Sequence, residues 1–252
     1  SSTSISAGLG YVRARDLKHE DYTVISVIGD GSLTGGMAYE ALNNASNLKT
    51  NFIVVLNDNH MSIPENVGGM SKYLDKIRTA DFYTGLKKGV TRTLEQIPVV
   101  GDSLIEQIRK TKSSIKQLVV PGMFFEDMGI TYLGPVPGHD VSMLCRAFKE
   151  AKKIEGPVLI HVLTTKGKGY EPAENEPSKF HGISPFQIET GEVKAKSSKD
   201  SYTDIFGKVM CDEAMKRKDI VAITAAMKDG TGLSRFQRIF PERFFDVGIA
   251  EE

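Results

Sequence analysis

Three things are scarce in this sequence: cysteine, net charge and long apolar runs. The 252 residues include two cysteines, Cys145 and Cys211, which lie in different predicted helices and form no Cys-x-x-Cys pair. This spacing argues against a disulfide framework and against a zinc site, so we expect two free thiols buried between packed elements. Lysine plus arginine and aspartate plus glutamate number 32 each. The overall charge therefore attracts neither nucleic acid nor an anionic membrane.

The apolar runs are also short. They stop well below the roughly 18 consecutive apolar residues that a membrane-spanning helix needs, and no signal-like segment opens the sequence. We therefore expect a cytoplasmic protein that binds neither membrane nor nucleic acid. The length allows one or two domains and is ample for a buried core.

A strand, helix, strand pattern stands near the start of the chain. Val24–Ile28 and Phe52–Leu56 are apolar runs of strand length, and Leu33–Leu48 has apolar or small residues at helical spacing. A connection of this length joins two parallel strands. Asp30 and Asn59 each follow one of these strands. The topology therefore predicts that both lie at the carboxyl edge of the sheet, where open α/β sheets bind ligands.

These two residues suggest a metal and a phosphate group as ligands. The carboxylate of Asp30 and the carboxamide of Asn59 are hard oxygen donors that suit Mg2+, and the carbonyl of Met61 could be a third. Nearby glycines let the backbone approach a phosphate, and the helix that opens near Thr34 directs free N–H groups at it. These glycines are Gly29, Gly31, Gly35 and Gly36. A lone Gly-Asp-Gly is ordinary turn chemistry, so the prediction depends on its pairing with Asn59.

Farther along, strands and helices continue to alternate. Tyr73–Leu118 predicts helices with a solvated basic face. Ile130–Leu133 and Pro157–Leu163 predict strands, with a helix over Val141–Ala151 between them, and His161 is a predicted core residue. This alternation favours an α/β protein with a doubly wound, mostly parallel sheet.

The composition changes after this region. Glycine, lysine, proline and serine replace the apolar periodicity, and a solvated linker is expected from about Gln187 to Asp200. A second α/β unit follows, with a helix over Asp204–Met215 and strands over Ile220–Ala225 and Arg243–Val247. We expect a first domain over residues 1–185, a linker over 186–201 and the start of a second domain over 202–252. The second unit is too short to close a sheet, so we expect exposed strand edges and an exposed apolar face.

Several segments also resemble one enzyme family. Gly29-Asp30-Gly31, with Asn59 beyond the next strand, is the metal and diphosphate motif of thiamine-diphosphate enzymes. Longer matches resemble the 1-deoxy-D-xylulose-5-phosphate synthase family, and the resemblance runs from Ser1 to Glu252. They are Gly29–Asn43, Leu56–Ile63, Val119–Gly122, Gly134–Asp140, Lys166–Glu174 and Phe245–Glu251.

The resemblance implies thiamine diphosphate and Mg2+ as cofactors, bound in a transketolase-like α/β fold. Asp30, Asn59 and Met61 would hold the metal. The implied coenzyme-binding residues are Ser1, Gly31, Ser32, Lys166, Tyr170 and Glu251, with Lys168 as an alternative to Lys166.

Glu251 and His181 are the implied catalytic residues. Glu251 would hydrogen-bond the aminopyrimidine ring and favour the imino tautomer that removes the C2 proton. Outside the family, a glutamate at this place is ordinarily a surface or capping residue. His181 would exchange protons with the substrates, although a loop histidine is often only exposed. His139 and Asp140 match a family motif that a strand-to-helix turn explains equally well, and His60 has no assigned role.

By this resemblance, the full enzyme is a homodimer that condenses pyruvate with D-glyceraldehyde 3-phosphate and releases CO2. Its product, 1-deoxy-D-xylulose 5-phosphate, feeds isoprenoid, thiamine and pyridoxal synthesis. The chain begins and ends inside family motifs, so we expect an internal fragment that is inactive alone. Two alternatives stay open. One is a transketolase or 2-oxoacid dehydrogenase component, which shares the metal motif but not Lys166–Glu174, and the other is a coenzyme-binding fragment without catalysis.

Overall fold

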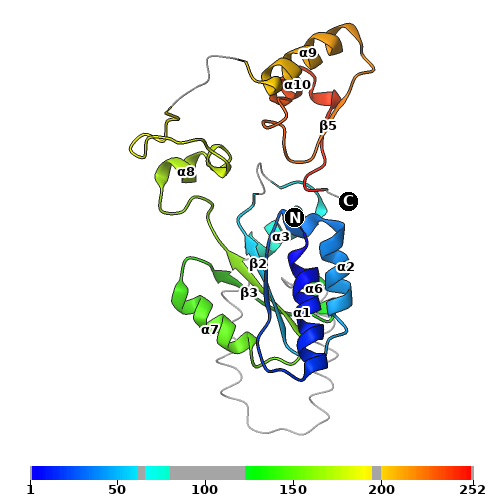
Figure 1. The fold of residues 1–252 in the computed structure, drawn as a ribbon, viewed down its shortest axis with the longest axis vertical. Helices are drawn as coiled ribbons and strands as arrows, with labels where there is room; N and C mark the ends of the chain where they lie inside the picture. Colours follow the sequence, from blue (N-terminus) through cyan, green and yellow to red (C-terminus); the bar gives the residue numbers. More distant parts are fainter. Residues whose placement is uncertain (1, 62–65, 80–122, 195–199, 251–252) are drawn as a thin grey trace.

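A four-stranded parallel sheet forms the centre of the first part of the chain (Figure 1). The computed structural model describes residues 2–61, 66–79, 123–194 and 200–250. The strands are β1 (Ile25–Gly29), β2 (Phe52–Asp58), β3 (Thr131–Pro137) and β4 (Pro157–Leu163). They pair in the order β1-β2-β4-β3, and all three pairings are parallel.

Helices cover both faces of this sheet. On one face, apolar side chains of α1 (Ser4–Lys18), α2 (Gly36–Ala45), α3 (Gly69–Thr79) and α6 (Met123–Asp127) share a core with the strands. On the other face, α7 (Val141–Ala151) packs against β2, β3 and β4. The predicted doubly wound α/β class is therefore confirmed (Figure 1).

The burial of each strand follows from its place in the sheet. The central strands β2 and β4 are apolar almost throughout and buried from both sides, as parallel strands under two helical layers must be. β1 lies at an edge and alternates instead. Ser26 and Ile28 are buried toward α1, whereas Ile25 and Val27 are 46% and 59% exposed on the opposite face.

Several element boundaries agree with the sequence prediction and others do not. Val141–Ala151 and Pro157–Leu163 coincide with α7 and β4. The single helix expected over Leu33–Leu48 is wrong: the structure has a 3-10 turn, η1 (Ser32–Thr34), and then α2. The two are separated because Gly35 takes an extended conformation, with φ −73° and ψ 146°.

The strands also run farther than predicted at their carboxyl ends. β2 continues past Leu56 to Asp58, and β3 continues past Leu133 to Pro137 with a register irregularity against β4. The helices predicted over Tyr73–Leu118 include part of α3, and the remainder lies outside the described residues.

A short irregular segment leads to the second unit. It contains α8 (Glu171–Asn175) and η2 (Lys179–His181). The second unit consists of α9 (Tyr202–Lys216), β5 (Ala222–Thr224), α10 (Ser234–Ile239), η3 (Pro241–Arg243) and β6 (Phe244–Asp246). β5 and β6 pair in parallel over a small core that includes Cys211 and Phe236.

The second unit exposes the apolar face that its short length predicts. Its exposed apolar side chains include Ile205, Phe206, Val209, Ile223 and Phe245, which are 48% to 66% exposed. The expectation for the cysteines is correct in one respect and wrong in another. Both thiols are free, but Cys145 is exposed, since it lies on a part of α7 that faces away from the sheet; Cys211 is buried.

Gly8 and Gly10 of α1 offer a matched test of this packing. A Cβ on Gly8 would lie 2.0 Å from Ser26 Oγ and 2.9 Å from Phe52, whereas nothing lies within 4 Å of a Cβ on Gly10. We expect Gly8→Ala to lower the free energy of unfolding by about 1–3 kcal/mol through overpacking. Gly10→Ala should raise it by about 0.5–1 kcal/mol through helix propensity. Urea denaturation of the two variants checks this, and equal effects would contradict the packing of α1.

Candidate functional site

The candidate site lies at the carboxyl edge of the neighbouring strands β1 and β2. Gly29 at the end of β1 is in register with Asn57 in β2, and the Asp30 N–H donates to the Asn57 carbonyl at 3.2 Å. Asp30 and Asn59 therefore leave the same edge of the sheet from adjacent strands. This is the arrangement that the sequence pattern predicted from strand order alone.

Asp30 is almost fully buried, with 2% of its surface exposed. One carboxyl oxygen accepts a hydrogen bond of 2.8 Å from Asn66 Nδ2. Burial, together with a hydrogen bond to Asp58 and the charge of Asp58, raises the pKa of Asp30 to about 7. A buried carboxyl group that resists ionisation is a natural partner for a cation, which favours the carboxylate form.

Asn59 and Met61 form the loop after β2. The Met61 N–H donates to Asn59 Oδ1 at 3.0 Å, and both residues are half-buried. An amide oxygen has two lone pairs, so Asn59 Oδ1 can still bind a cation. Among the described residues, no three side chains of His, Cys, Asp or Glu gather as a metal site. One carboxylate with an amide oxygen and a carbonyl oxygen fits Mg2+, which takes few protein ligands and completes its shell with water and phosphate oxygens.

The turn after Asp30 is suited to hold a phosphate group. Gly31 and Ser32 lead into η1, and α2 opens immediately afterward. The hydroxyl of Thr34 donates to the Gly31 carbonyl at 2.7 Å, and the hydroxyl of Ser2 donates to the Ser32 carbonyl at 2.8 Å. These bonds fix the turn at the start of a helix, where free N–H groups attract anions. Ser1, which the resemblance adds to this group, lies outside the described residues.

Lys166 is the predicted coenzyme-binding lysine that approaches this edge. It is half-buried, and burial lowers the pKa of its ammonium group while the charge of Asp30 partly offsets this effect. Lys168 instead lies 3.4 Å from Glu174. Lys166 is therefore the better candidate for an anionic ligand next to Asp30.

Tyr170 and His181 lie in the α8–η2 segment. The Tyr170 hydroxyl donates to the Ile188 carbonyl at 2.7 Å, and its ring packs against Phe180 and Phe186. His181 is exposed at the end of η2. Across the described part of the chain, no hydrogen bond or ion pair joins either residue to Asp30 or Asn59.

A cavity nonetheless connects this segment with the metal candidate. Its volume is about 460 Å³, and it is lined by Met61, by Asn175 to Lys179, and by Lys228 and Asp229 of the second unit. Lys179 begins η2, two residues before His181. The α8–η2 segment and Met61, in the loop after β2, therefore line the same cavity.

The end of the second unit also reaches the phosphate turn. Thr34 Oγ1 donates to the Ile249 carbonyl at 3.3 Å. Glu251 lies outside the described residues. Its neighbours, however, lie at the edge that carries Asp30.

Comparisons with known proteins bear on this geometry. The family model described as 1-deoxy-D-xylulose-5-phosphate synthase matches residues 1–164. The chain belongs to the 1-deoxy-D-xylulose-5-phosphate synthase family. The model described as transketolase, pyrimidine binding domain, matches residues 198–252. The division into residues 1–185, 186–201 and 202–252 stays a prediction.

Relatives of this synthase-family chain are longer than it is. Proteins named 1-deoxy-D-xylulose-5-phosphate synthase from Lachnoclostridium phytofermentans and Caldanaerobacter subterraneus are each 57% identical over 252 residues. One from Desulfitobacterium hafniense is 54% identical over the same length. Each match covers 100% of this chain, and the chain spans 40% of each relative. A transketolase structure from Campylobacter jejuni is 16% identical, with a TM-score of 0.40, over 98% of this chain and 43% of that one.

Two residues beside the site, Asp58 and Arg78, were not predicted from the sequence. Asp58 ends β2 with its side chain fully buried, and Arg78 of α3 and His161 of β4 both bond to its carboxylate. Burial opposes the charge of Asp58, but the bonds from His161 and Asp30 and the charge of Arg78 lower its pKa. The sequence did contain a signal for Asp58, because alternate residues of a strand share one face and Asp58 therefore lies on the same buried face as Val54 and Leu56. His161 is buried as predicted.

His60, His139 and Asp140 each contact a nearby residue. Asp140 caps α7 by accepting a hydrogen bond from the Met143 N–H at 3.0 Å, and His139 Nε2 accepts from the Thr165 N–H at 2.8 Å. His60 Nδ1 lies 3.0 Å from Asp75. A turn between strand and helix was one explanation of the His139 and Asp140 pair, and it accounts for Asp140, which caps α7.

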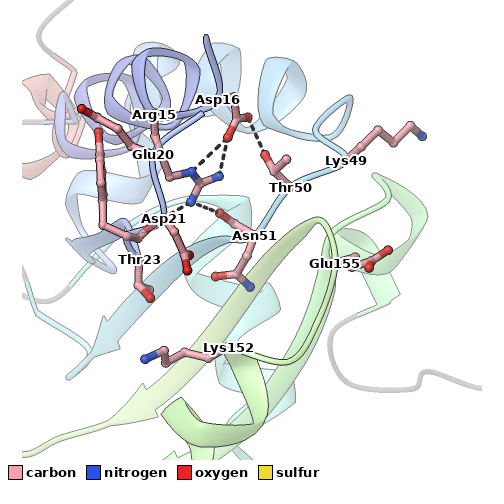
Figure 2. A pocket seen from close by; sticks show the side chains of 11 residues that line it. Arg15, Asp16, Glu20, Asp21, Thr23, Lys49, Thr50, Asn51, Lys152 and Glu155 are labelled. Carbon is pink, nitrogen blue, oxygen red and sulfur yellow. Dashed lines mark hydrogen bonds and ion pairs between the residues drawn. The ribbon is translucent and has the colours of Figure 1, made fainter. Parts of the chain in front are cut away.

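Figure 2 shows a larger hollow at the opposite, amino-terminal edge of the sheet, with a volume of about 770 Å³. The Arg15 guanidinium projects into it and bonds to the Asp16 carboxylate and to the carbonyls of Tyr22 and Asn51 (Figure 2). The Thr50 hydroxyl donates to Asp16 at 2.6 Å. These polar groups pair with one another and tie α1 to the strand starts. We therefore read this hollow as structural.

The raised pKa of Asp30 predicts how stability depends on pH. Its pKa in the fold, about 7, exceeds the value of 3.8 for the free side chain. Ionisation in the metal-free fold is therefore unfavourable, and the penalty grows from about pH 4 and is complete above pH 7. Asp30→Asn removes this penalty. Since each pKa unit corresponds to about 1.4 kcal/mol, we expect the variant to be more stable than the parent by up to about 4 kcal/mol at pH 8.

The difference should be about half as large at pH 5.5, where Asp30 is already ionised in the unfolded state but still protonated in the fold. Urea denaturation of the metal-free parent and of Asp30→Asn at the two pH values measures it. A constant difference, or a loss of stability at pH 8, would show that Asp30 is not held in the environment described above.

Proposed function

We propose that the intact protein is a thiamine-diphosphate- and Mg2+-dependent synthase. It condenses pyruvate with D-glyceraldehyde 3-phosphate to give 1-deoxy-D-xylulose 5-phosphate and CO2, the entry to isoprenoid precursors. The observation that carries this proposal is the convergence of Asp30 and Asn59 beside the η1 turn, in a chain of this family. The relatives' printed names supply the reaction.

In this proposal the first unit holds the metal and the diphosphate. Asp30, Asn59 and the Met61 carbonyl bind Mg2+, and N–H groups of Gly31 and Ser32 bind phosphate oxygens. Lys166 lies close enough to Asp30 to sense its charge, so its ammonium group can neutralise the diphosphate. Ser1 and Tyr170 contact the coenzyme as the family resemblance implies. When bound, the coenzyme supplies an electron sink for the carbon skeleton of pyruvate.

The second unit provides Glu251. A carboxyl group hydrogen-bonded to the pyrimidine ring can hold the proton that sets the tautomer. The contact of Thr34 with Ile249 supports this placement, because it brings the end of the second unit to the phosphate turn. His181 exchanges protons with the substrates from the segment that borders the cavity at Met61.

The protein's surroundings belong to the same proposal. We propose a cytoplasmic homodimer without nucleic-acid or membrane partners. None of the described helices is long and apolar enough to cross a membrane.

Asp30→Ala tests the metal site. Loss of a charged ligand should weaken Mg2+-dependent thiamine-diphosphate binding about 10- to 100-fold, and excess Mg2+ should restore it only in part. Isothermal titration calorimetry of the intact protein measures the affinity. Asp21→Ala, which removes an exposed carboxylate at the opposite edge of the sheet, serves as the control and should bind as the parent does. Unchanged, metal-dependent affinity in Asp30→Ala would refute the assignment.

Glu251→Gln tests the second unit. The amide keeps a hydrogen-bonding group but loses the ionisable proton, so coenzyme affinity should fall only slightly. Exchange of the coenzyme C2 proton for deuterium should slow by about 100-fold or more. Quenched-flow exchange followed by proton NMR reports the rate, and an unchanged rate would remove Glu251 from the mechanism.

A further inference from the structure

Four polar side chains cross the sheet in the order of its strands. Tyr132 lies on β3, His161 on β4 and Asp58 at the end of β2, and Asp30 follows β1. All four are nearly or fully buried, at 5%, 0%, 1% and 2% exposure. They lie on the same face of the sheet as Leu159, the face that packs against α1, α2 and α6. The sheet therefore carries one continuous polar row beneath the candidate metal site.

Hydrogen bonds join the first three side chains of this row. Tyr132 Oη lies 2.7 Å from His161 Nδ1, and His161 Nε2 lies 2.7 Å from Asp58 Oδ2. Asp30 and Asp58 directly follow the paired residues Gly29 and Asn57, and their two buried carboxyl groups interact. The carboxylate of Asp58 accepts, so His161 donates through Nε2, and Nδ1 is then left to accept the Tyr132 hydroxyl proton.

Asp58 is also fixed from the helix side. Arg78 of α3 bonds to both carboxylate oxygens, and its Nε donates to Oδ2 at 3.1 Å. The Tyr132 ring is stacked on Phe125 with an angle of 8° between the ring planes. Asp58 and Tyr132 are thus held by packed elements, and Asp58 has little freedom to rotate.

A purely structural ion pair between α3 and the sheet is the simpler interpretation. It accounts for Arg78 but not for the contact of Asp58 with a second buried carboxyl group. Two buried carboxyl groups together disfavour the metal-free fold, whereas a nearby cation would favour both. The arrangement is therefore better suited to a cation site than to stability alone.

We propose that Asp58 is a positioning residue that orients Asp30 for Mg2+ and adds negative charge beside the metal. His161 and Arg78 hold Asp58 in place, and Tyr132 holds the His161 ring. This inference rests on the proposed metal site. Mg2+ requires near-ideal octahedral geometry, whereas Ca2+ accepts irregular geometry, so a well-oriented Asp30 favours Mg2+.

The test compares two substitutions of His161, to Gln and to Asn, whose side chains differ in length by one methylene group. A Gln amide can reach the place of Nε2 and still donate to Asp58, whereas an Asn amide is too short to do so. We expect His161→Asn to raise the Mg2+ dissociation constant about tenfold and His161→Gln to raise it about threefold or less. Titration calorimetry of the intact protein with thiamine diphosphate, at pH 8, measures both.

A selectivity measurement separates orientation from general damage. Loss of orientation should weaken Mg2+ binding more than Ca2+ binding, so the ratio of the Ca2+ to the Mg2+ dissociation constant should fall about threefold or more in His161→Asn. Ser26→Ala removes a buried hydrogen bond of 2.8 Å to the Ser4 carbonyl in the same sheet. This control should leave both dissociation constants within about twofold of the parent. Asp58→Asn should weaken both cations, because it also removes charge.

The possible results are distinct. If Asp30→Ala leaves Mg2+ binding unchanged, the proposed metal site is wrong. If Asp30→Ala weakens binding but His161→Asn, His161→Gln and Ser26→Ala all behave as the parent does, only the positioning role is wrong. A fall in Mg2+ affinity with an unchanged Ca2+ to Mg2+ ratio in His161→Asn also overturns it. Should Asp58→Asn fail to fold, the two His161 variants still decide the question.

Discussion

The parallel pairing of β1 with β2 is the constraint on which the functional edge depends. It sets Gly29 against Asn57, and Asp30 and Asn59 then leave the sheet at the same edge. A shift of one residue would turn Asp30 to the other face of the sheet, away from Asp58. The register is held by an almost fully buried β2, whose apolar side chains contact helices on both faces. The apolar core therefore determines the geometry of the polar edge.

This edge stabilises the fold poorly by itself. Two carboxyl groups are buried next to each other, and desolvation together with their mutual repulsion raises the pKa of Asp30. Arg78 and His161 compensate Asp58, but a buried ion pair gives little net stability compared with apolar packing. The free energy needed to hold these charges comes from the cores on either side of the sheet. Such a local conflict in an otherwise consistent sequence is typical of a functional site.

The sequence predicts the strands of the first sheet well, because buried parallel strands are short apolar runs that end at glycine or polar residues. It predicts α7 and β4 to the residue. It fails where one residue overrides a pattern. Gly35 interrupts helical spacing with an extended backbone, which composition alone does not reveal.

Asp58 illustrates the other limit. Its partners Arg78 and His161 are 20 and 103 residues away, so no local pattern joins the three side chains. The candidate ligands Asp30 and Asn59 could be predicted from the sequence, because each follows a predicted strand and both belong to the family motif. The exposure of Cys145 could not be predicted from the sequence, since it depends on which side of α7 meets the sheet.

The two units differ in how complete they are. The first has helices on both faces of its sheet, whereas the second has two short strands and leaves Ile223 and Phe245 exposed. The second unit therefore depends on further contacts to cover its apolar face. One end of it is already placed, because the Ile249 carbonyl accepts from Thr34 at the phosphate turn. A coenzyme with a diphosphate at one end and a pyrimidine at the other matches such an arrangement, since each unit needs to recognise one end only. In the proposed function, the contact at Thr34 brings the parts that bind the two ends together, and the polar row under Asp30 orients the first.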